Sequence, residues 1–276
     1  MTFVPHYRLI EGAAGADPNL GKLAFVLHGA LGSGQNFNRF VQKLCRERPE
    51  YRFVLVDLRH HGESRGAPAP NTLSACAGDL VALGARLGRE PDVLIGHSFG
   101  GKVALEYARQ GSRALRQVWV LDAVPGAQGE GDQTEIAAVI RAVRSVPMPA
   151  SSRRDVVEYL VQRAGLSSGL AEWMATNLRR QAEHYEWTFD LDAIQELMAD
   201  YFAVDLWGFL ERPREAPELH LVVAERSDRW TAVERERARA LPPETRVVYH
   251  ELANSGHWVH VDNPDGLLRI LLPGMI

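Results

Sequence analysis

The chain has only two cysteines, no long apolar run and no dominant charge sign. Its 276 residues include 31 basic and 35 acidic side chains, so the formal net charge is −4. That balance gives no reason to expect nucleic-acid binding. The longest apolar runs, such as residues 118–121, stop far short of the roughly 18 residues that a membrane span requires. We therefore expect no membrane span and no nucleic-acid partner.

The cysteine spacing and the N-terminal residues indicate the cellular compartment of the protein. Cys45 and Cys76 lie in separate helical patterns, which argues against a disulfide framework or a cysteine-based zinc site. Residues 1–12 lack the basic start and the apolar stretch of a secretory signal. The sequence predicts a cytoplasmic protein with two buried free thiols.

What the chain does contain is a repeated strand and helix pattern. Apolar residues make up 46% and charged residues 24%, as in ordinary globular proteins. Runs rich in Val, Leu and aromatics, each leading into a loop and a helical pattern, predict six parallel strands of an α/β fold. They are residues 23–28, 51–57, 92–96, 117–122, 218–224 and 245–251. Residues 3–10 suggest an additional edge strand or hairpin.

Helical spacing marks the layers around this sheet and an interruption of it. Residues 73–87 repeat apolar positions every three or four residues behind Thr72, and Pro264 begins a final helix. Between residues 126 and 208 strand patterns disappear while helical spacing persists. We therefore expect a core of residues 1–125 and 209–276 with an all-helical insertion at 126–208. Most of the insertion's aromatics belong to its own packing, and a few are expected to line a pocket.

The most informative segment is a G-x-S-x-G pattern at the junction of a predicted strand and a predicted helix. Gly96, Ser98 and Gly100 occupy its fixed positions. A serine on such a turn projects its hydroxyl outward from strained backbone, and the small flanking residues let strand and helix approach closely. We interpret Ser98 as a nucleophile on a nucleophile elbow.

A serine nucleophile needs an oxyanion hole made of two backbone N–H donors. Phe99, directly after the serine, supplies one donor at the start of its helix. The second is expected from the loop after residues 23–28, where Gly29 permits close backbone approach. The sequence predicts an oxyanion hole formed by the Ala30 and Phe99 amides.

Four segments together resemble the α/β-hydrolase family over nearly the whole chain. They are HGALGS at 28–33, DLRHHGES at 57–64, GHSFGG at 96–101 and SGHWVHVDNP at 255–264. The resemblance is greatest to the YbfF-like branch of small-acyl esterases, which implies a mostly parallel sheet, an inserted helical cap and a serine esterase needing no cofactor. One departure is His60, where the family usually has glycine. His60 and His61 lack neighbouring ligands, so we expect no metal.

The general base is sought among ten histidines. His257 follows the last predicted strand, at the same edge of the sheet as the nucleophile, and the resemblance also makes its loop the catalytic-histidine loop. His260, three residues on, is the nearest rival, and His250 lies within a strand. A histidine has the pKa that activates a serine near neutral pH, so we assign this role to His257.

Two aspartates at strand ends are candidates for the acid that orients His257. Most α/β-hydrolases place the acid after the later strand in a motif resembling G-x-x-D, but counting from Ala224 puts Ser227 there and Asp228 one residue late. Asp122 follows the strand after the nucleophile helix, a placement that the YbfF-like resemblance favours. Neighbouring parallel strands lie about 4.8 Å apart, so this carboxylate can reach the histidine. We favour Asp122 for the Ser-His-Asp triad, with Asp228 as the alternative.

Parts of the sequence also resemble or allow functions other than serine hydrolysis. Gly96 to Lys102 also reads G-x-x-x-x-G-K, but Val103 stands where a nucleotide-binding loop needs a hydroxyl for magnesium. A non-hydrolytic ligand receptor on the same fold remains an alternative, because fold does not fix function. A carbon–carbon bond hydrolase or lyase of the same family is another. The sequence favours hydrolysis of a small or medium acyl ester or thioester, a small-molecule partner, and leaves the oligomeric state open.

Overall fold

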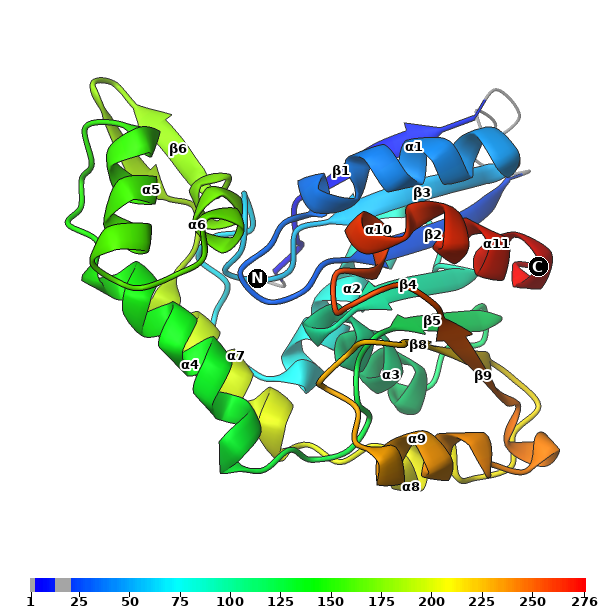
Figure 1. Ribbon diagram of the computed structural model, residues 1–276. Helices are drawn as coiled ribbons and strands as arrows, with labels where there is room; N and C mark the ends of the chain where they lie inside the picture. Colours follow the sequence, from blue (N-terminus) through cyan, green and yellow to red (C-terminus); the bar gives the residue numbers. More distant parts are fainter. Residues whose placement is uncertain (1–2, 13–20) are drawn as a thin grey trace.

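Seven strands form one sheet in the order β1-β3-β2-β4-β5-β8-β9 (Figure 1). The computed structural model describes residues 3–12 and 21–276. The strands are β1 (Tyr7–Glu11), β2 (Lys22–Leu27), β3 (Tyr51–Val56), β4 (Val93–His97), β5 (Gln117–Leu121), β8 (Glu218–Ala224) and β9 (Val247–Leu252). All neighbouring pairs are parallel except β1 with β3. The six predicted parallel strands and the predicted edge strand are therefore confirmed.

The last strand begins two residues later than predicted. Pro243–Thr245 form a short 3-10 turn, η2, and Arg246 adopts a left-handed backbone with φ 53°. That conformation cannot continue an extended strand, so pairing with β8 starts at Val247.

Helices cover both faces of the sheet and divide the core in two. One layer holds α1 (Asn38–Glu47) and α11 (Pro264–Gly274), and the other holds α2 (Leu73–Leu87) and α3 (Phe99–Gln110). Successive residues of a strand point to opposite faces, so Phe25 joins the α2 and α3 layer while Val26 joins the α1 and α11 layer. Both cysteines are free and buried, Cys45 in one core and Cys76 in the other, as predicted.

Thr72 and Pro264 begin helices at the positions that the sequence predicts. The Thr72 hydroxyl accepts a hydrogen bond from the Ala75 amide at the start of α2, and Gly88 ends that helix with φ 78°. Pro264 occupies the first turn of α11. The core also contains η1 (Gly34–Phe37), α9 (Ala232–Arg239) and α10 (Val259–Asp262), and α8 (Trp207–Leu210) lies where the insertion returns to the core. No helix in residues 3–12 or 21–276 is both long and apolar enough to cross a membrane.

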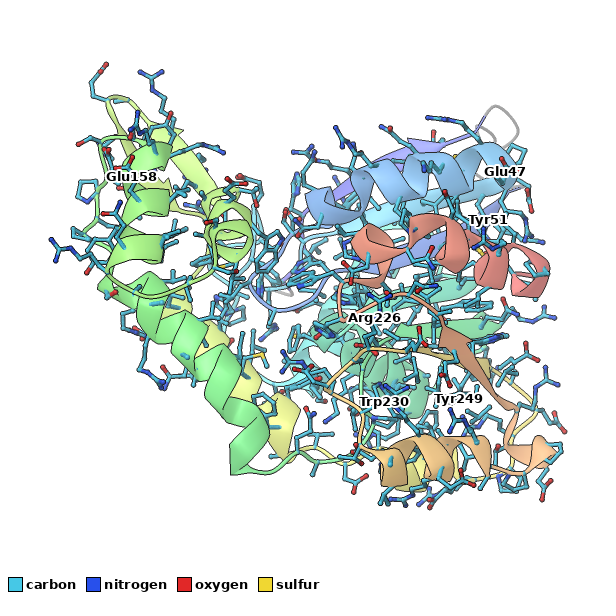
Figure 2. All side chains as sticks on the ribbon, viewed as in Figure 1. Glu47, Tyr51, Glu158, Arg226, Trp230 and Tyr249 are labelled. Atoms are coloured by element: carbon cyan, nitrogen blue, oxygen red, sulfur yellow. The ribbon has the colours of Figure 1, made fainter. Side chains whose placement is uncertain are left out.

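Residues 126–208 are inserted between β5 and β8 and stand to one side of the sheet (Figure 1). Their helices are α4 (Glu130–Ser145), α5 (Arg153–Gln162), α6 (Ser168–Ala175) and α7 (Leu191–Ala203). Figure 2 shows Glu158 on α5, at the side of this insertion away from the sheet.

The prediction that the insertion is entirely helical is wrong. Strands β6 (Leu178–Gln181) and β7 (His184–Trp187) pair as an antiparallel hairpin. Both strands are only partly buried, so they lack the dense apolar run that marks the strands of the main sheet. Their two-residue connection is Ala182 and Glu183, with Ala182 at φ 49°, and contains none of the Asn or Gly residues that signal such a turn.

A buried ion pair holds the loop after β3 against α2. Arg59 donates from Nε and Nη2 to the two carboxylate oxygens of Asp79, at 2.7 and 2.9 Å, and both side chains are less than a tenth exposed. Its Nη1 donates to the carbonyls of Pro68 and Pro70. This fork geometry pairs the guanidinium with the carboxylate through two parallel charge-assisted hydrogen bonds.

Replacing Asp79 by alanine leaves this guanidinium buried without its counter-charge. We expect the free energy of unfolding to fall by about 3–5 kcal/mol, measured by urea denaturation. The control is Glu158→Ala, which removes the exposed pair with Arg154 and should leave stability unchanged within error. A loss below about 1 kcal/mol in Asp79→Ala would contradict the role given to this pair.

Candidate active site

Ser98 lies on a sharp turn between β4 and α3. Its backbone has φ 51° and ψ −116°, a left-handed conformation that costs free energy for a residue with a side chain. The Ser98 amide donates to the Leu121 carbonyl at 3.0 Å, which ties the turn to β5. A Cβ at Gly96 would collide with the backbone of Gly100, and a Cβ at Gly100 would lie 2.6 Å from the His28 carbonyl oxygen. Both glycines of the pattern are therefore required sterically.

Asp122 and His257 are brought together at the ends of their segments. The His257 Nδ1–H donates to Asp122 Oδ2 at 2.8 Å, and the Asp122 side chain is fully buried. The other carboxylate oxygen accepts the Ala224 amide at 3.0 Å. Asp122 has φ 48°, and its amide donates to the Val222 carbonyl, so the carboxylate is held by backbone from β8.

Sequence reasoning missed the role of Ser227. Its hydroxyl donates to Asp122 Oδ2 at 2.6 Å, the oxygen that also accepts from His257. Ser227 stands at the position where the G-x-x-D motif of the family would place the acid. The sequence contained one signal for this role, which is the departure from the G-x-x-D motif. A polar side chain at the motif position of the acid is expected to face the same histidine loop.

Asp228, the alternative acid, does not contact His257. Its side chain is 78% exposed and faces Arg229, with 3.4 Å between Oδ1 and Nε. It lies in the loop after β8, two residues after Arg226 and two before Trp230, both of which are labelled in Figure 2. Asp228 does border the same cavity as Ser98.

The two predicted oxyanion donors lie near the serine. Phe99 is the first residue of α3, where an amide has no partner within the helix. In the loop after β2, the Leu31 amide donates to His61 Nε2 and the Gly32 amide to the Gly29 carbonyl. Within the described residues this leaves the Ala30 amide without a hydrogen bond, and Ala30 borders the cavity beside Ser98.

Two buried histidines hold this loop and its neighbour. His28 donates from Nδ1 to the Gly29 carbonyl at 2.7 Å and accepts the Leu58 amide at Nε2. His61 donates from Nδ1 to the Arg59 carbonyl and accepts at Nε2. Burial lowers the pKa of both, that of His61 to about 3, so each remains neutral with one donating and one accepting nitrogen. Sequence reasoning gave His28 only the role of shaping its loop, which these bonds bear out, and it gave His61 no positioning role.

His60 occupies the backbone position for which the family usually has glycine. Its φ is 64°, in the left-handed region that favours glycine, and its ring Nε2 lies 2.8 Å from Asn71 Oδ1. No group of three or more His, Cys, Asp or Glu side chains in residues 3–12 and 21–276 is placed to hold a metal ion.

Two further histidines surround His257. The His97 Nε2–H donates to the His257 carbonyl at 2.7 Å, and His260 stacks on Phe37 with 4.0 Å between ring centroids. Burial, with the neighbouring His257 charge, lowers the pKa of His97 well below its usual value and that of His260 to about 4. His260 is buried against Phe37, whereas His257 contacts Asp122.

A cavity of about 740 Å³ opens over these residues. Ser98 and His257 border it from the core, and the insertion contributes apolar walls. These walls include Ile136, Val139, Leu170, Met198, Tyr201 and Phe202. Trp173 on α6 meets Trp258 of the histidine loop edge to face, with 4.5 Å between ring centroids.

The insertion also reaches the loop after β2. Asn177, which is buried, donates from Nδ2 to the Leu31 carbonyl at 2.9 Å. This contact fixes the loop that carries Ala30 against the end of α6. No motif in the sequence points to Asn177, because the contact joins segments far apart in the chain.

A twisted, mostly parallel sheet with helices on both faces and a serine on the turn after the central strand defines the α/β-hydrolase fold. The chain matches the model of the α/β-hydrolase family over residues 24–270 and belongs to that family. The predicted family and fold are confirmed.

Several of the relatives that the chain matches are named as esterases or lipases. The sn-1-specific diacylglycerol lipase ABHD11 of Mus musculus is 29% identical over 266 residues, covering 95% of this chain and 82% of the relative. Esterase YbfF of Escherichia coli (strain K12) is 25% identical over 246 residues, covering 89% and 90%. A solved marine microorganism esterase shares the fold, with TM-score 0.82, 22% identity and coverage of 98% and 99%. These relatives support hydrolase activity.

The two candidate acids are distinguished by the effect on kcat of replacing each one. Asp122→Asn removes the charge that accepts the His257 Nδ1–H, so kcat for p-nitrophenyl butyrate should fall by about 10⁴. Asp228→Asn changes an exposed side chain and should keep kcat near the wild-type value. Steady-state kinetics on both variants decides between them. If Asp228→Asn collapses kcat while Asp122→Asn retains it, Asp228 is the acid.

Proposed function

We propose that this chain is a serine hydrolase that cleaves carboxylic esters or thioesters of small to medium acyl groups. The observation that carries the proposal is the 2.8 Å bond from His257 Nδ1 to buried Asp122, at the cavity that also contains Ser98 on its left-handed turn. Ser98 is the proposed nucleophile, His257 the general base and Asp122 the acid.

Acylation begins when Ser98 Oγ attacks the carbonyl carbon of the substrate. His257 accepts the hydroxyl proton at Nε2, because its Nδ1–H is occupied by Asp122. The negative oxygen of the tetrahedral intermediate accepts hydrogen bonds from the Ala30 and Phe99 amides. Collapse expels the alcohol or thiol, which takes its proton from His257 and leaves the acyl group on Ser98.

Deacylation repeats these steps with water. His257 removes a proton from the water as it attacks the acyl carbon, and then returns a proton to Ser98 Oγ as the carboxylic acid leaves. Asp122 remains ionised and stabilises the imidazolium that forms twice in each cycle. Nucleophilic attack by Ser98 or water, loss of the leaving group, proton transfer by His257 and hydrogen bonding account for every step, so the proposal includes no cofactor.

The size and walls of the cavity support an apolar acyl group as the substrate moiety. Seven of its apolar wall residues, Trp173 among them, come from the insertion, which we propose acts as a cap over Ser98. The names of ABHD11 and YbfF support ester hydrolysis. An ester or a thioester would present the same carbonyl to Ser98.

Covalent labelling tests the nucleophile directly. A fluorophosphonate should add to Ser98 in the wild type, because phosphonylation needs an activated serine and the oxyanion hole. Intact-mass analysis should show one adduct in the wild type and none in Ser98→Ala. No adduct on the wild type, or an unchanged adduct on the variant, would show the proposal to be wrong.

A second experiment tests whether the insertion selects the acyl chain. Trp173→Ala removes an aromatic side chain from the cavity wall, so the optimum in kcat/KM across p-nitrophenyl acetate to decanoate should move to longer chains. The control is Trp187→Ala, which alters a tryptophan stacked on Phe189 in the insertion and absent from the cavity wall. Equal profiles in both variants would contradict a cap that sets chain length.

A further inference from the structure

The lysine of the G-x-x-x-x-G-K pattern is completely buried and serves no step of the proposed reaction. Lys102 lies in the first turn of α3, directly beyond the glycines of the nucleophile turn, and none of its surface is exposed. Its Nζ donates to three backbone carbonyls, those of Gly126 at 2.7 Å, Tyr201 at 2.7 Å and Val204 at 2.9 Å. All three protons of the ammonium are used.

These carbonyls come from both segments that join the insertion to the core. Gly126 lies where the chain leaves the core after β5, whereas Tyr201 and Val204 lie at the end of α7, where the chain returns. The two segments also bond to each other. The Gln128 amide donates to the Phe202 carbonyl at 2.9 Å, and the Leu206 amide donates to the Pro125 carbonyl at 3.0 Å.

Burying the charged Lys102 side chain costs free energy that burying a neutral side chain would not. Burial lowers the pKa of Lys102 to about 8, while the charges of Asp205, Asp200 and Glu234 act in the opposite direction. The three hydrogen bonds of the ammonium go to backbone carbonyls, and its charge also lies 4.6 Å from the centroid of the Tyr201 ring. An apolar residue of similar volume avoids this desolvation cost, so the lysine supplies geometry rather than simple stability.

The geometry affects the cavity through α7. Tyr201, whose carbonyl Lys102 holds, and its neighbour Phe202 both form part of the cavity wall. The Tyr201 ring also lies 6.0 Å from the ring of Phe99, the residue after the nucleophile. A shift of the α7 end relative to α3 would therefore change the distance between this wall and Ser98.

We propose that Lys102 is a positioning residue that clamps both junctions of the insertion to the nucleophile helix and thereby sets acyl-chain selectivity. The inference rests on the proposed hydrolase function. It assigns to the lysine of a pattern that resembles a nucleotide-binding loop a role in shaping the acyl site.

The test is Lys102→Met, which keeps an unbranched side chain and removes all three donors. The matched control is Lys43→Met, which removes a half-exposed lysine on α1. Active sites are first counted with the fluorophosphonate, and kcat/KM is then measured for p-nitrophenyl butyrate and octanoate. The octanoate-to-butyrate ratio should change by about tenfold or more in Lys102→Met and stay at the wild-type value in Lys43→Met.

A readout independent of catalysis accompanies the kinetics. Hydrogen exchange of residues 126–128 and 201–206 should be faster in Lys102→Met than in the wild type, because both junctions lose their shared partner. If the methionine variant does not fold, Lys102→Gln, whose amide keeps two donors, should shift the ratio in the same direction by less.

An unchanged ratio together with unchanged exchange in a folded variant overturns the inference, and so does failure of both variants to fold, which indicates a purely structural role. Failure of the wild type to react with the fluorophosphonate overturns the proposed function instead. In that case faster exchange in Lys102→Met would still support the clamp, so the two failures are distinguishable.

Discussion

The left-handed backbone at Ser98 is the constraint on which the rest of the site depends. A residue with a side chain adopts this conformation only where its surroundings compensate for the strain. Here the Ser98 amide is held by the Leu121 carbonyl, and the glycines on either side let β4, α3 and the loop after β2 meet without collision. The same close approach sets the start of α3 beside that loop, which places the Phe99 and Ala30 amides near one cavity.

The hydrogen bonds around Asp122 connect neighbouring segments at the same edge of the sheet. One oxygen of its carboxylate accepts from His257 and Ser227, and the other accepts the Ala224 amide, so the histidine loop, β5 and the loop after β8 are joined at one buried group. His97 supports the histidine loop through its backbone. A buried carboxylate that accepts three hydrogen bonds has little freedom to rotate, and it fixes the ring orientation of His257.

The insertion is coupled to the same centre by polar contacts rather than by apolar packing alone. Asn177 binds the loop that carries Ala30, and Lys102 binds both junctions of the insertion from the helix that follows Ser98. These contacts therefore hold the cavity wall in a fixed position relative to Ser98.

The sequence by itself determined the six parallel strands, their alternation with helices along the core, and the strand-to-helix turn that carries Ser98, because buried parallel strands and the G-x-S-x-G pattern are local signals. It also indicated His257 and both candidate acids. Only the tertiary structure decided that Asp122, not Asp228, contacts His257 and that Ser227 joins them, since these residues meet across separate strands. The hairpin of β6 and β7 and the buried partners of Lys102 likewise depend on contacts between distant segments, which no periodicity records.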